Sequence, residues 1–277
     1  MKTSYFEKGK ARWNYNDILA ELDNFIPIFE QRPIKNNKGG MQFANMFYFF
    51  FILKNKKPSL VIESGVFKGQ STWLIEQALP DCEIISIDID LNQREYFSRK
   101  AKYSNADFKF QDFSNIPSDT LVFFDDHINH MERIMEAKFF NIKNIIFEDN
   151  YSSNEGDFQT IKQIYKNYSF NHSPGFLSLL KTSFHFNILV LNKILKKNYY
   201  AKENIDKISK RIRDGSKKVN FKDLEKNISF YYEFPHLFSE KNINFEKEPI
   251  LKEIPSNIKF NAEELEVNNF FTYLEIY

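Results

Sequence analysis

The sequence predicts an α/β fold in which a mostly parallel sheet of about seven strands is covered by helices on both faces. Short apolar runs alternate with helical stretches from residue 58 to residue 168, and this rhythm is typical of parallel strands joined by helices. The runs are continuously apolar rather than alternating, which indicates strands buried on both faces. A turn that contains two glycines follows the first run, where sheets of this kind bind ligands.

Composition excludes several classes of protein. The 277 residues carry a net charge of +1, so the overall field does not favour binding to nucleic acid. One cysteine, Cys82, rules out a framework of disulfides. The longest apolar run, Met46–Leu53, is far shorter than the roughly 20 residues that span a bilayer. Without a recognisable secretory signal, we expect a soluble cytoplasmic protein that does not bind membranes.

Residues 1–57 are predicted to form a helical segment packed on the core. Apolar residues recur with helical spacing over residues 15–31, and Met41–Lys54 reads as a second, largely buried helix. Pro58 and Ser59 follow this helix and end it.

Residues 58–168 are predicted to form the core of the sheet. Flanking turn residues and β-branched or aromatic content separate its strands from its helices. The predicted strands are Leu60–Ile62, Glu83–Ile87, Phe108–Phe110, Leu121–Phe124 and Ile145–Phe147, and the predicted helices are Ser71–Ala78, Leu91–Tyr103, Met131–Phe139 and Phe158–Asn167.

The remainder divides into a helical insertion, residues 169–228, and a closing part, residues 229–277. Residues 193–226 contain 12 Lys or Arg and 5 Asp or Glu, an excess of seven positive charges. Such a segment either attracts an anionic substrate or is a solvated helix face, and its apolar positions suit core packing or a homo-oligomer contact. Phe230–Glu233 and Thr272–Ile276 are the candidate last strands.

The segment VIESGVFKGQS, residues 61–71, carries the sharpest signal. A strand runs into Gly65, Gly69 follows, and Ser71 opens a helix, so backbone N–H groups are available to a ligand. The G-x-G-x-x-G pattern of dinucleotide sites is absent. A phosphate-binding loop is also disfavoured, because the spacing is one residue short and Gln70 stands where lysine is required.

Carboxylates follow the predicted strands at the same edge of the sheet. Glu63 ends the first strand, Asp88 follows the second and Asp112 follows the third. S-adenosylmethionine offers an ammonium, two ribose hydroxyls and an adenine amino group, all of which donate hydrogen bonds to such acids. We therefore expect this cofactor, with Asp88 on the ribose and Asp112 near the adenine.

The stretch GGMQFANMFYFFFILKNKKPSLVIESGVFKGQSTWLIEQALPDCEIISIDID resembles bacterial class I S-adenosylmethionine-dependent methyltransferases. It is most similar to those that modify polysaccharides and small molecules, related to the cephalosporin hydroxylase-like group. The resemblance covers residues 38–168 and extends to YYEFPHLF at 231–238. It implies a Rossmann-like fold in which Gly65, Gly69, Gln70 and Ser71 line the methionine end and Asp88 holds the ribose. Phe67 replaces the second glycine of the commoner E-x-G-x-G-x-G turn.

A second group of polar residues follows the fourth and fifth strands, in the sequences FFDDH and FEDN. If these strands are neighbours, their ends bring many oxygen atoms and few nitrogens to one cleft, which suits Mg²⁺ or another hard divalent cation. The pair resembles metal-dependent O-methyltransferases of the catechol type. That resemblance implies the ligands Asp125 (or Asp126), Asp149 and Asn150, and the cephalosporin hydroxylase-like group adds Glu148.

Two alternatives to the metal site stay open. In one, His127 or His130 is a general base without a metal, because histidine titrates near neutral pH. In the other, the acids only cap the sheet. The sequence thus predicts methyl transfer from S-adenosylmethionine to oxygen on a small molecule or sugar, with Asp125 or His127 activating the hydroxyl. The rivals are N-methylation or other chemistry on the same fold, and a non-catalytic module that binds an anionic partner.

Overall fold

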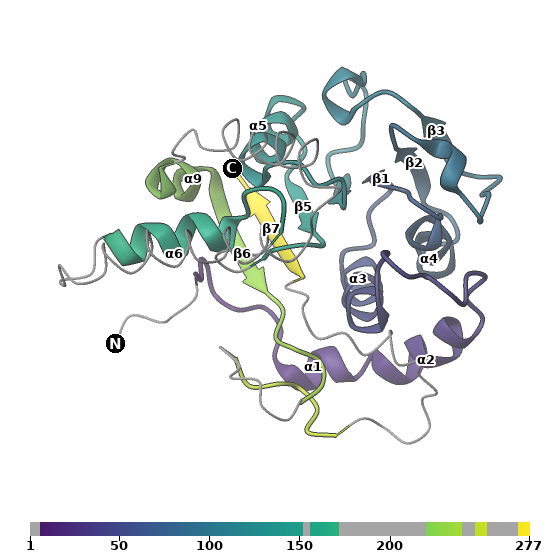
Figure 1. Ribbon diagram of the computed structural model, residues 1–277, viewed down its shortest axis with the longest axis horizontal. Helices are drawn as coiled ribbons and strands as arrows, with labels where there is room; N and C mark the ends of the chain where they lie inside the picture. Colours follow the sequence, from purple (N-terminus) through teal and green to yellow (C-terminus); the bar gives the residue numbers. More distant parts are fainter. Residues whose placement is uncertain (1–5, 152–155, 172–219, 240–246, 254–270) are drawn as a thin grey trace, which may run out of the picture.

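The computed structural model describes residues 6–151, 156–171, 220–239, 247–253 and 271–277. Its centre is a seven-stranded sheet in the order β3-β2-β1-β4-β5-β7-β6, in which β7 alone runs antiparallel to its neighbours (Figure 1). The predicted mostly parallel, Rossmann-like sheet is therefore confirmed. The strands are β1 (Leu60–Ser64), β2 (Glu83–Ile87), β3 (Lys102–Ser104), β4 (Leu121–Phe124), β5 (Asn144–Phe147), β6 (Ile228–Glu233) and β7 (Thr272–Ile276).

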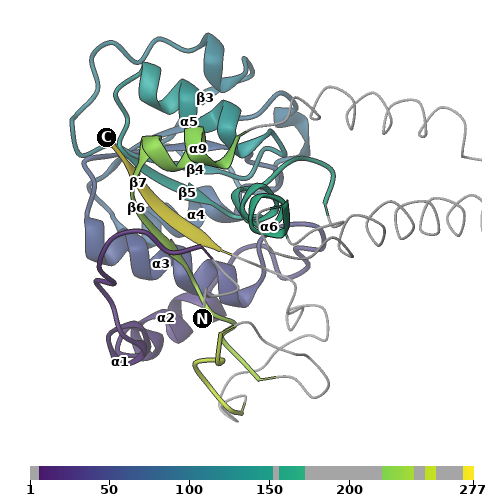
Figure 2. The same ribbon diagram turned by 90° about the vertical axis from the view of Figure 1, so that its left-hand side faces the viewer.

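Helices cover both faces of the sheet because neighbouring residues of its central strands point to opposite sides. Val61 and Phe123 pack against one set of helices, and Ile62 and Val122 pack against the other. The first set is α1 (Tyr15–Leu19), α2 (Leu22–Glu30), α3 (Phe43–Lys56) and α4 (Gln70–Ala78). The second set is α5 (His130–Phe139), α6 (Ile161–Asn171) and α9 (Phe221–Asn227), on the opposite side of the sheet (Figure 2).

The strand order reverses between β1 and β4, which are hydrogen-bonded neighbours although β2 and β3 lie between them in the chain. Ligands of open parallel sheets bind outside the carboxyl ends of the strands at such a switch point. The residues that follow β1, β2, β4 and β5 share this edge, so the fold gathers them as the sequence predicts.

The N-terminal segment is helical as expected, with one difference. The predicted helix over residues 15–31 consists of two helices, α1 and α2. Asn14 accepts the backbone N–H groups of Asn16 and Asp17 and so starts α1. The buried helix predicted at Met41–Lys54 is α3, and its aromatic face reaches the sheet, where Phe49 stacks on Phe123 with 4.3 Å between ring centroids.

The region between β2 and β4 differs from the prediction. The helix predicted at Leu91–Tyr103 is wrong: only the short 3₁₀ turn η1 (Leu91–Gln93) forms. The backbone N–H groups of Glu95 and Tyr96 donate to the carbonyl oxygen of Lys68 at 2.9 Å each. These bonds hold the segment against the glycine turn and remove donors that a helix would need.

The strand predicted at Phe108–Phe110 is also wrong. It is a 3₁₀ turn, η2, started by the Asp107 carboxylate, which accepts the Lys109 N–H at 3.1 Å. The third strand is Lys102–Ser104 instead. Phe108 is fully buried and Phe110 is largely exposed, so the two phenylalanines do not share a buried face as they would on a strand of the sheet.

The hairpin of β6 and β7 confirms the predicted last strands. Residues 172–219, which contain most of the predicted insertion and of the basic stretch, lie outside the described residues. Within the described part of the chain, no helix is long and apolar enough to cross a membrane.

Candidate functional site

The turn after β1 requires both of its glycines. Gly65 has φ of +101°, and its N–H donates to the carbonyl oxygen of Ile87 at 2.9 Å. A Cβ at Gly65 would lie 2.1 Å from the backbone oxygen of Asp125, so the turn passes directly against the residue that follows β4. Gly69, with φ of +90°, precedes the first residue of α4. The turn therefore brings the ends of β1, β2 and β4 together.

Phe67 stands where the commoner turn has its second glycine, and it adopts the left-handed conformation with φ of +47°. This conformation disfavours residues other than glycine. Asp88 compensates, because its Oδ2 accepts the N–H groups of Val66 and Phe67 at 2.8 and 2.9 Å. Its Oδ1 accepts the N–H of Asp90. A carboxylate has about four acceptor positions, so Asp88 supports the turn and retains capacity for a ligand.

Glu63 lies beneath the turn and is fully buried. Its Oε2 accepts the hydroxyls of Thr72 at 2.5 Å and Ser86 at 2.7 Å. Burial raises the pKa of Glu63, and the neighbouring hydroxyls of Ser71, Thr72 and Ser86 oppose this rise. The side chain therefore ties α4 and β2 to the first strand.

Three buried acceptor atoms around this edge have no hydrogen-bond partner in the described part of the chain. They are Oδ1 of Asn45 on α3, Oε1 of Glu63 on β1 and Oε1 of Gln70 on α4. An unsatisfied buried acceptor typically costs about 1–3 kcal/mol. A ligand that brings hydrogen-bond donors, such as an ammonium group, would remove this cost.

Asp112 is exposed, and its Oδ1 accepts the N–H of Ser114 at 3.0 Å. Because η2 replaces the strand predicted before it, Asp112 does not follow a strand of the sheet. The reason for placing it beside an adenine is therefore lost.

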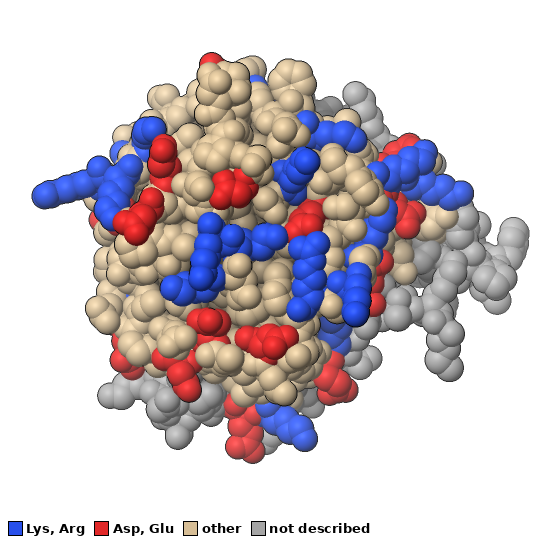
Figure 3. All heavy atoms as spheres, turned by 180° about the vertical axis from the view of Figure 1, so that it is seen from behind, with Lys and Arg blue, Asp and Glu red and all other residues tan. Residues whose placement is uncertain are grey.

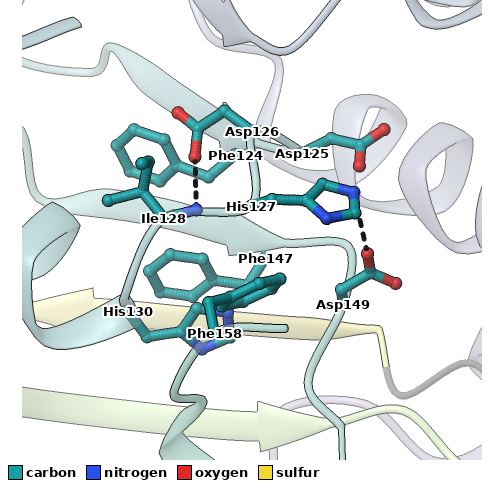
Figure 4. A pocket seen from close by; sticks show the side chains of 9 residues that line it. All are labelled: Phe124, Asp125, Asp126, His127, Ile128, His130, Phe147, Asp149 and Phe158. Atoms are coloured by element: carbon teal, nitrogen blue, oxygen red, sulfur yellow. Dashed lines mark hydrogen bonds and ion pairs between the residues drawn. The ribbon is translucent and has the colours of Figure 1, made fainter. Parts of the chain in front are cut away.

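The two aspartates after β4 have separate roles. Asp126 accepts a hydrogen bond from the Ser64 hydroxyl at 2.5 Å and pairs with Arg133 at 2.8 Å. Arg133 is buried and also pairs with Asp107 and Glu136. Both aspartates line the pocket, but the Asp125 carboxylate lies near the His127 ring (Figure 4). Of the two, it is Asp125 that is grouped with His127 and Asp149.

Asp125, His127 and Asp149 form a compact group at the ends of β4 and β5. Each offers one ligand atom, and these atoms lie within 4.8 Å of one another. The His127 ring lies between the two carboxylates, with Nε2 3.9 Å from Asp149 Oδ2 (Figure 4). Its Nδ1 is 3.0 Å from Oδ1 of Asp157. The group opens into a small pocket lined by Phe124, Asp125, Asp126, His127, Ile128, His130, Phe147, Asp149 and Phe158.

This group is short of positive charge. Burial, followed by the nearby charges of Asp149 and Asp126, raises the pKa of Asp125 well above its ordinary value. Burial, with Asp149 and Asp125 nearby, does the same for the pKa of Glu148. Among the described residues, no lysine or arginine forms an ion pair with Asp125, Glu148 or Asp149. The carboxylates and the imidazole form a donor set that fits a divalent cation.

Asn150 is not brought into this group. Its side chain is fully buried, and its Oδ1 accepts the N–H of Lys162 at 3.0 Å. Its Nδ2 donates to the Tyr231 hydroxyl at 2.7 Å and the Thr272 hydroxyl at 3.0 Å. The amide therefore joins α6 to the β6–β7 hairpin. Glu148 is adjacent to the group but turns to α3, where its Oε1 accepts from Asn45 Nδ2 at 2.5 Å.

His130 lines the pocket from the start of α5 but is held as a neutral ring. It stacks on Phe147 with 3.7 Å between ring centroids, and its Nδ1 accepts the N–H of Ile161 at 3.3 Å. Burial lowers the pKa of His130 to about 3, against a hydrogen bond to the backbone of Asp149. Such a histidine is a poor proton acceptor at neutral pH, which leaves His127 as the exposed imidazole of the site.

Three residues of the site, Asn45, Arg133 and Asp157, are not predicted from the sequence. Asn45 does carry a signal, because it is a polar residue within the otherwise apolar FANMFYFFFIL stretch of α3. Arg133 and Asp157 carry no such signal, because charged residues are ordinary in a surface helix and in a loop.

No protein-family model matches this chain, and no curated protein matches it. Among solved structures, it is similar to the SAH-bound methyltransferase PaMTH1 from Podospora anserina, with 12% identity and a TM-score of 0.37 over 50% of this chain and 72% of the other. It is also similar to cmcI-N160 SAH, with 17% identity and a TM-score of 0.36 over 52% and 80% of the two chains. The structure cmcI-D160 Mg-SAM matches with 17% identity and a TM-score of 0.33 over 65% and 78%.

Proposed function

We propose that this protein is an S-adenosylmethionine-dependent methyltransferase that methylates oxygen on a small molecule or sugar. One observation carries the proposal: the glycine turn after β1 lies against Asp88 on one side and Asp125 on the other. A site for a donor-rich, cationic ligand and a site for a metal or base thus meet at the switch point of the sheet. This juxtaposition is what transfer of a methyl group between two bound molecules requires.

The cofactor would rest on the turn and on the start of α4. Asp88 would accept a ribose hydroxyl with the acceptor position that the N–H groups of Val66, Phe67 and Asp90 leave free. The unpaired oxygens of Glu63, Gln70 and Asn45 offer acceptors to the ammonium of the methionine end. Ser71, buried at the first turn of α4, lies at the same end.

The acceptor hydroxyl would bind at the pocket beside Asp125 and Asp149. A divalent cation held by these carboxylates would lower the pKa of the hydroxyl and hold it beside the methyl donor. The protein contributes alignment of nucleophile, methyl group and sulfur, which supplies much of the rate in a direct displacement. In the metal-free alternative, His127 takes the hydroxyl proton while Asp157 orients its ring.

Calorimetry with S-adenosylhomocysteine tests this proposal. The intact protein is expected to bind it, and Asp88→Ala is expected to lose about ten- to a hundred-fold in affinity, because a charged hydrogen bond contributes about 1.5–3 kcal/mol. Asp23→Ala, an exposed position on α2, is the matched control and should bind normally. The proposal fails if the intact protein does not bind, or if Asp88→Ala binds as well as the control.

We further propose that the acceptor is anionic and that the basic stretch of residues 193–226 attracts it. Exposed charges are screened over about 8–10 Å at physiological ionic strength, so activity at low acceptor concentration should fall as salt is added. The double substitution of Lys217 and Lys218 by Glu should raise KM more than it lowers kcat. Steady-state kinetics at two ionic strengths measures both, and an unchanged KM would contradict the steering role.

A further inference from the structure

We propose that His127 is a metal ligand, and that the site therefore prefers a first-row transition metal, in the series from Mn²⁺ to Zn²⁺, over Mg²⁺. This inference deepens the proposed function, on which the catalytic use of the metal rests. The oxygen-rich sequence around Asp125 and Asp149 favours Mg²⁺. The folded chain adds a nitrogen to that donor set, and nitrogen changes which metal it suits.

The first support is geometry. The ligand atoms of Asp125, His127 and Asp149 lie within 4.8 Å of one another. Two ligands on opposite sides of an ion, each at about 2.1 Å, are about 4.2 Å apart. Adjacent ligands at that distance are about 3.0 Å apart, so side-chain rotations that move these atoms by about an ångström bring all three onto one ion. Three protein ligands leave positions for water and for an acceptor hydroxyl.

The second support is the orientation of the ring. Nδ1 of His127 is 3.0 Å from Oδ1 of Asp157. A carboxylate at this distance favours a hydrogen on Nδ1, so Nε2 would present its lone pair to a bound metal ion. Nε2 is the atom that faces Asp149. Metal-binding histidines commonly have this arrangement, with the second ring nitrogen held by a carboxylate.

The third support is charge. Asp125 and Asp149 have no lysine or arginine partner among the described residues, whereas Asp126, next in sequence, pairs with Arg133. The charge of Asp126 is thus balanced by Arg133, whereas the charge of Asp125 would be balanced by a bound cation. A neutral imidazole adds a ligand without adding repulsion to the two carboxylates.

Metal binding to the chelator-treated, full-length protein tests the inference. Calorimetry with Mn²⁺, Co²⁺ and Mg²⁺ should show Co²⁺ and Mn²⁺ binding about ten-fold or more tighter than Mg²⁺. In His127→Asn, the affinity for Co²⁺ should fall about 10- to 100-fold, while that for Mg²⁺ changes little because Mg²⁺ prefers oxygen. Asparagine tolerates the left-handed backbone at this position, φ +56°, so the variant should fold.

Pulsed electron paramagnetic resonance of bound Mn²⁺ gives a direct readout. Wild type should show coupling to a histidine nitrogen, and His127→Asn should not. Asp157→Asn should weaken Co²⁺ binding by less than His127→Asn, and Asp23→Asn, an exposed control on α2, should have no effect. Equal affinity for Mg²⁺ and Co²⁺, absence of nitrogen coupling, or coupling that persists in His127→Asn would each overturn the inference.

The same samples separate this inference from the proposed function. If the metal results hold and S-adenosylhomocysteine does not bind, His127 is a ligand and the methyltransferase proposal fails. If S-adenosylhomocysteine binds and nitrogen coupling is absent, the methyltransferase proposal stands and His127 is not a ligand.

Discussion

At the scale of single residues, the candidate site depends on neighbours in sequence that have opposite roles. Asp125 faces the pocket, whereas Asp126 pairs with the buried guanidinium of Arg133. His127 lies between two carboxylates, whereas His130 is stacked on Phe147. The types of these residues do not distinguish them. Their positions do: Asp125 and Asp126 are consecutive at a strand end and point to different sides, whereas His127 lies in the following loop and His130 begins α5.

The two aspartates provide a matched test. Asp126→Asn should destabilise the protein by about 1–3 kcal/mol, because Arg133 loses one buried charged partner and keeps Asp107 and Glu136. Asp125→Asn should leave stability unchanged or raise it, because it removes a carboxylate that repels its neighbours, and it should abolish binding of Mn²⁺. Urea denaturation and Mn²⁺ calorimetry measure the two effects. The assignment is wrong if Asp126→Asn is the variant that loses the metal.

At the scale of elements, the glycine turn and helix α3 build the site together. The turn gathers three strand ends, and α3 brings Asn45 to Glu148. The N-terminal helical segment therefore contributes to the acidic end of the site as well as to the core. The segment after β2 also supports the site. Its backbone N–H groups at Glu95 and Tyr96 donate to the carbonyl oxygen of Lys68 in the turn instead of forming helical hydrogen bonds.

Gly65→Ala tests how tightly the turn is packed. Its Cβ would meet the backbone oxygen of Asp125 at 2.1 Å, and backbone moves at greater cost than a side chain. Gly39→Ala is the matched control, because Gly39 also has positive φ, +82°, but its Cβ would meet nothing within 4 Å. We expect a loss of about 1 kcal/mol for Gly39→Ala and of more than about 3 kcal/mol for Gly65→Ala, measured by urea denaturation. Equal losses would show that the contact with Asp125 does not constrain the turn.

At the scale of the whole molecule, ion pairs join distant parts of the chain. Lysine and arginine side chains are mixed with acids on the face shown in Figure 3. Glu275 on β7 pairs with Arg12 of the N-terminal segment and with Lys56 of α3. It thereby ties the last strand to the first part of the chain.

Glu275 should make stability depend on pH. Burial alone would raise its pKa, but hydrogen bonds from Arg12, Lys56 and Tyr273 lower it from 4.5 to about 2. A carboxyl with a lowered folded-state pKa stabilises the protein fully above the unfolded value, and this contribution is lost as pH falls from about 4.5 to 2. Over that range, the free energy of unfolding of wild type should fall by roughly 1–2 kcal/mol more than that of Glu275→Gln.

Thermal or urea unfolding at several pH values measures the difference, and Glu83→Gln, in an exposed pair with Lys102, is the control. Parallel pH profiles for wild type and Glu275→Gln would contradict this role.

The sequence by itself determined six of the seven strands, their burial on both faces and the edge of the sheet where the polar residues gather. These follow from local patterns: apolar runs such as Leu121–Phe124, the glycines at 65 and 69, and acids immediately after strands. It also led to two errors, at Leu91–Tyr103 and Phe108–Phe110, where the same local patterns were overridden by contacts with Lys68 and by burial of Phe108 alone.

Only the tertiary structure determined the partners and the orientation of each polar residue at this edge of the sheet. Asp125 was separated from Asp126 by Arg133, Asn150 was drawn into a buried network with Tyr231 and Thr272, and His127 was oriented by Asp157. Each of these arrangements depends on a partner that is distant in the sequence. The pairing energy of a buried polar group depends on the atoms within hydrogen-bond reach, and no local pattern of residue types specifies these atoms.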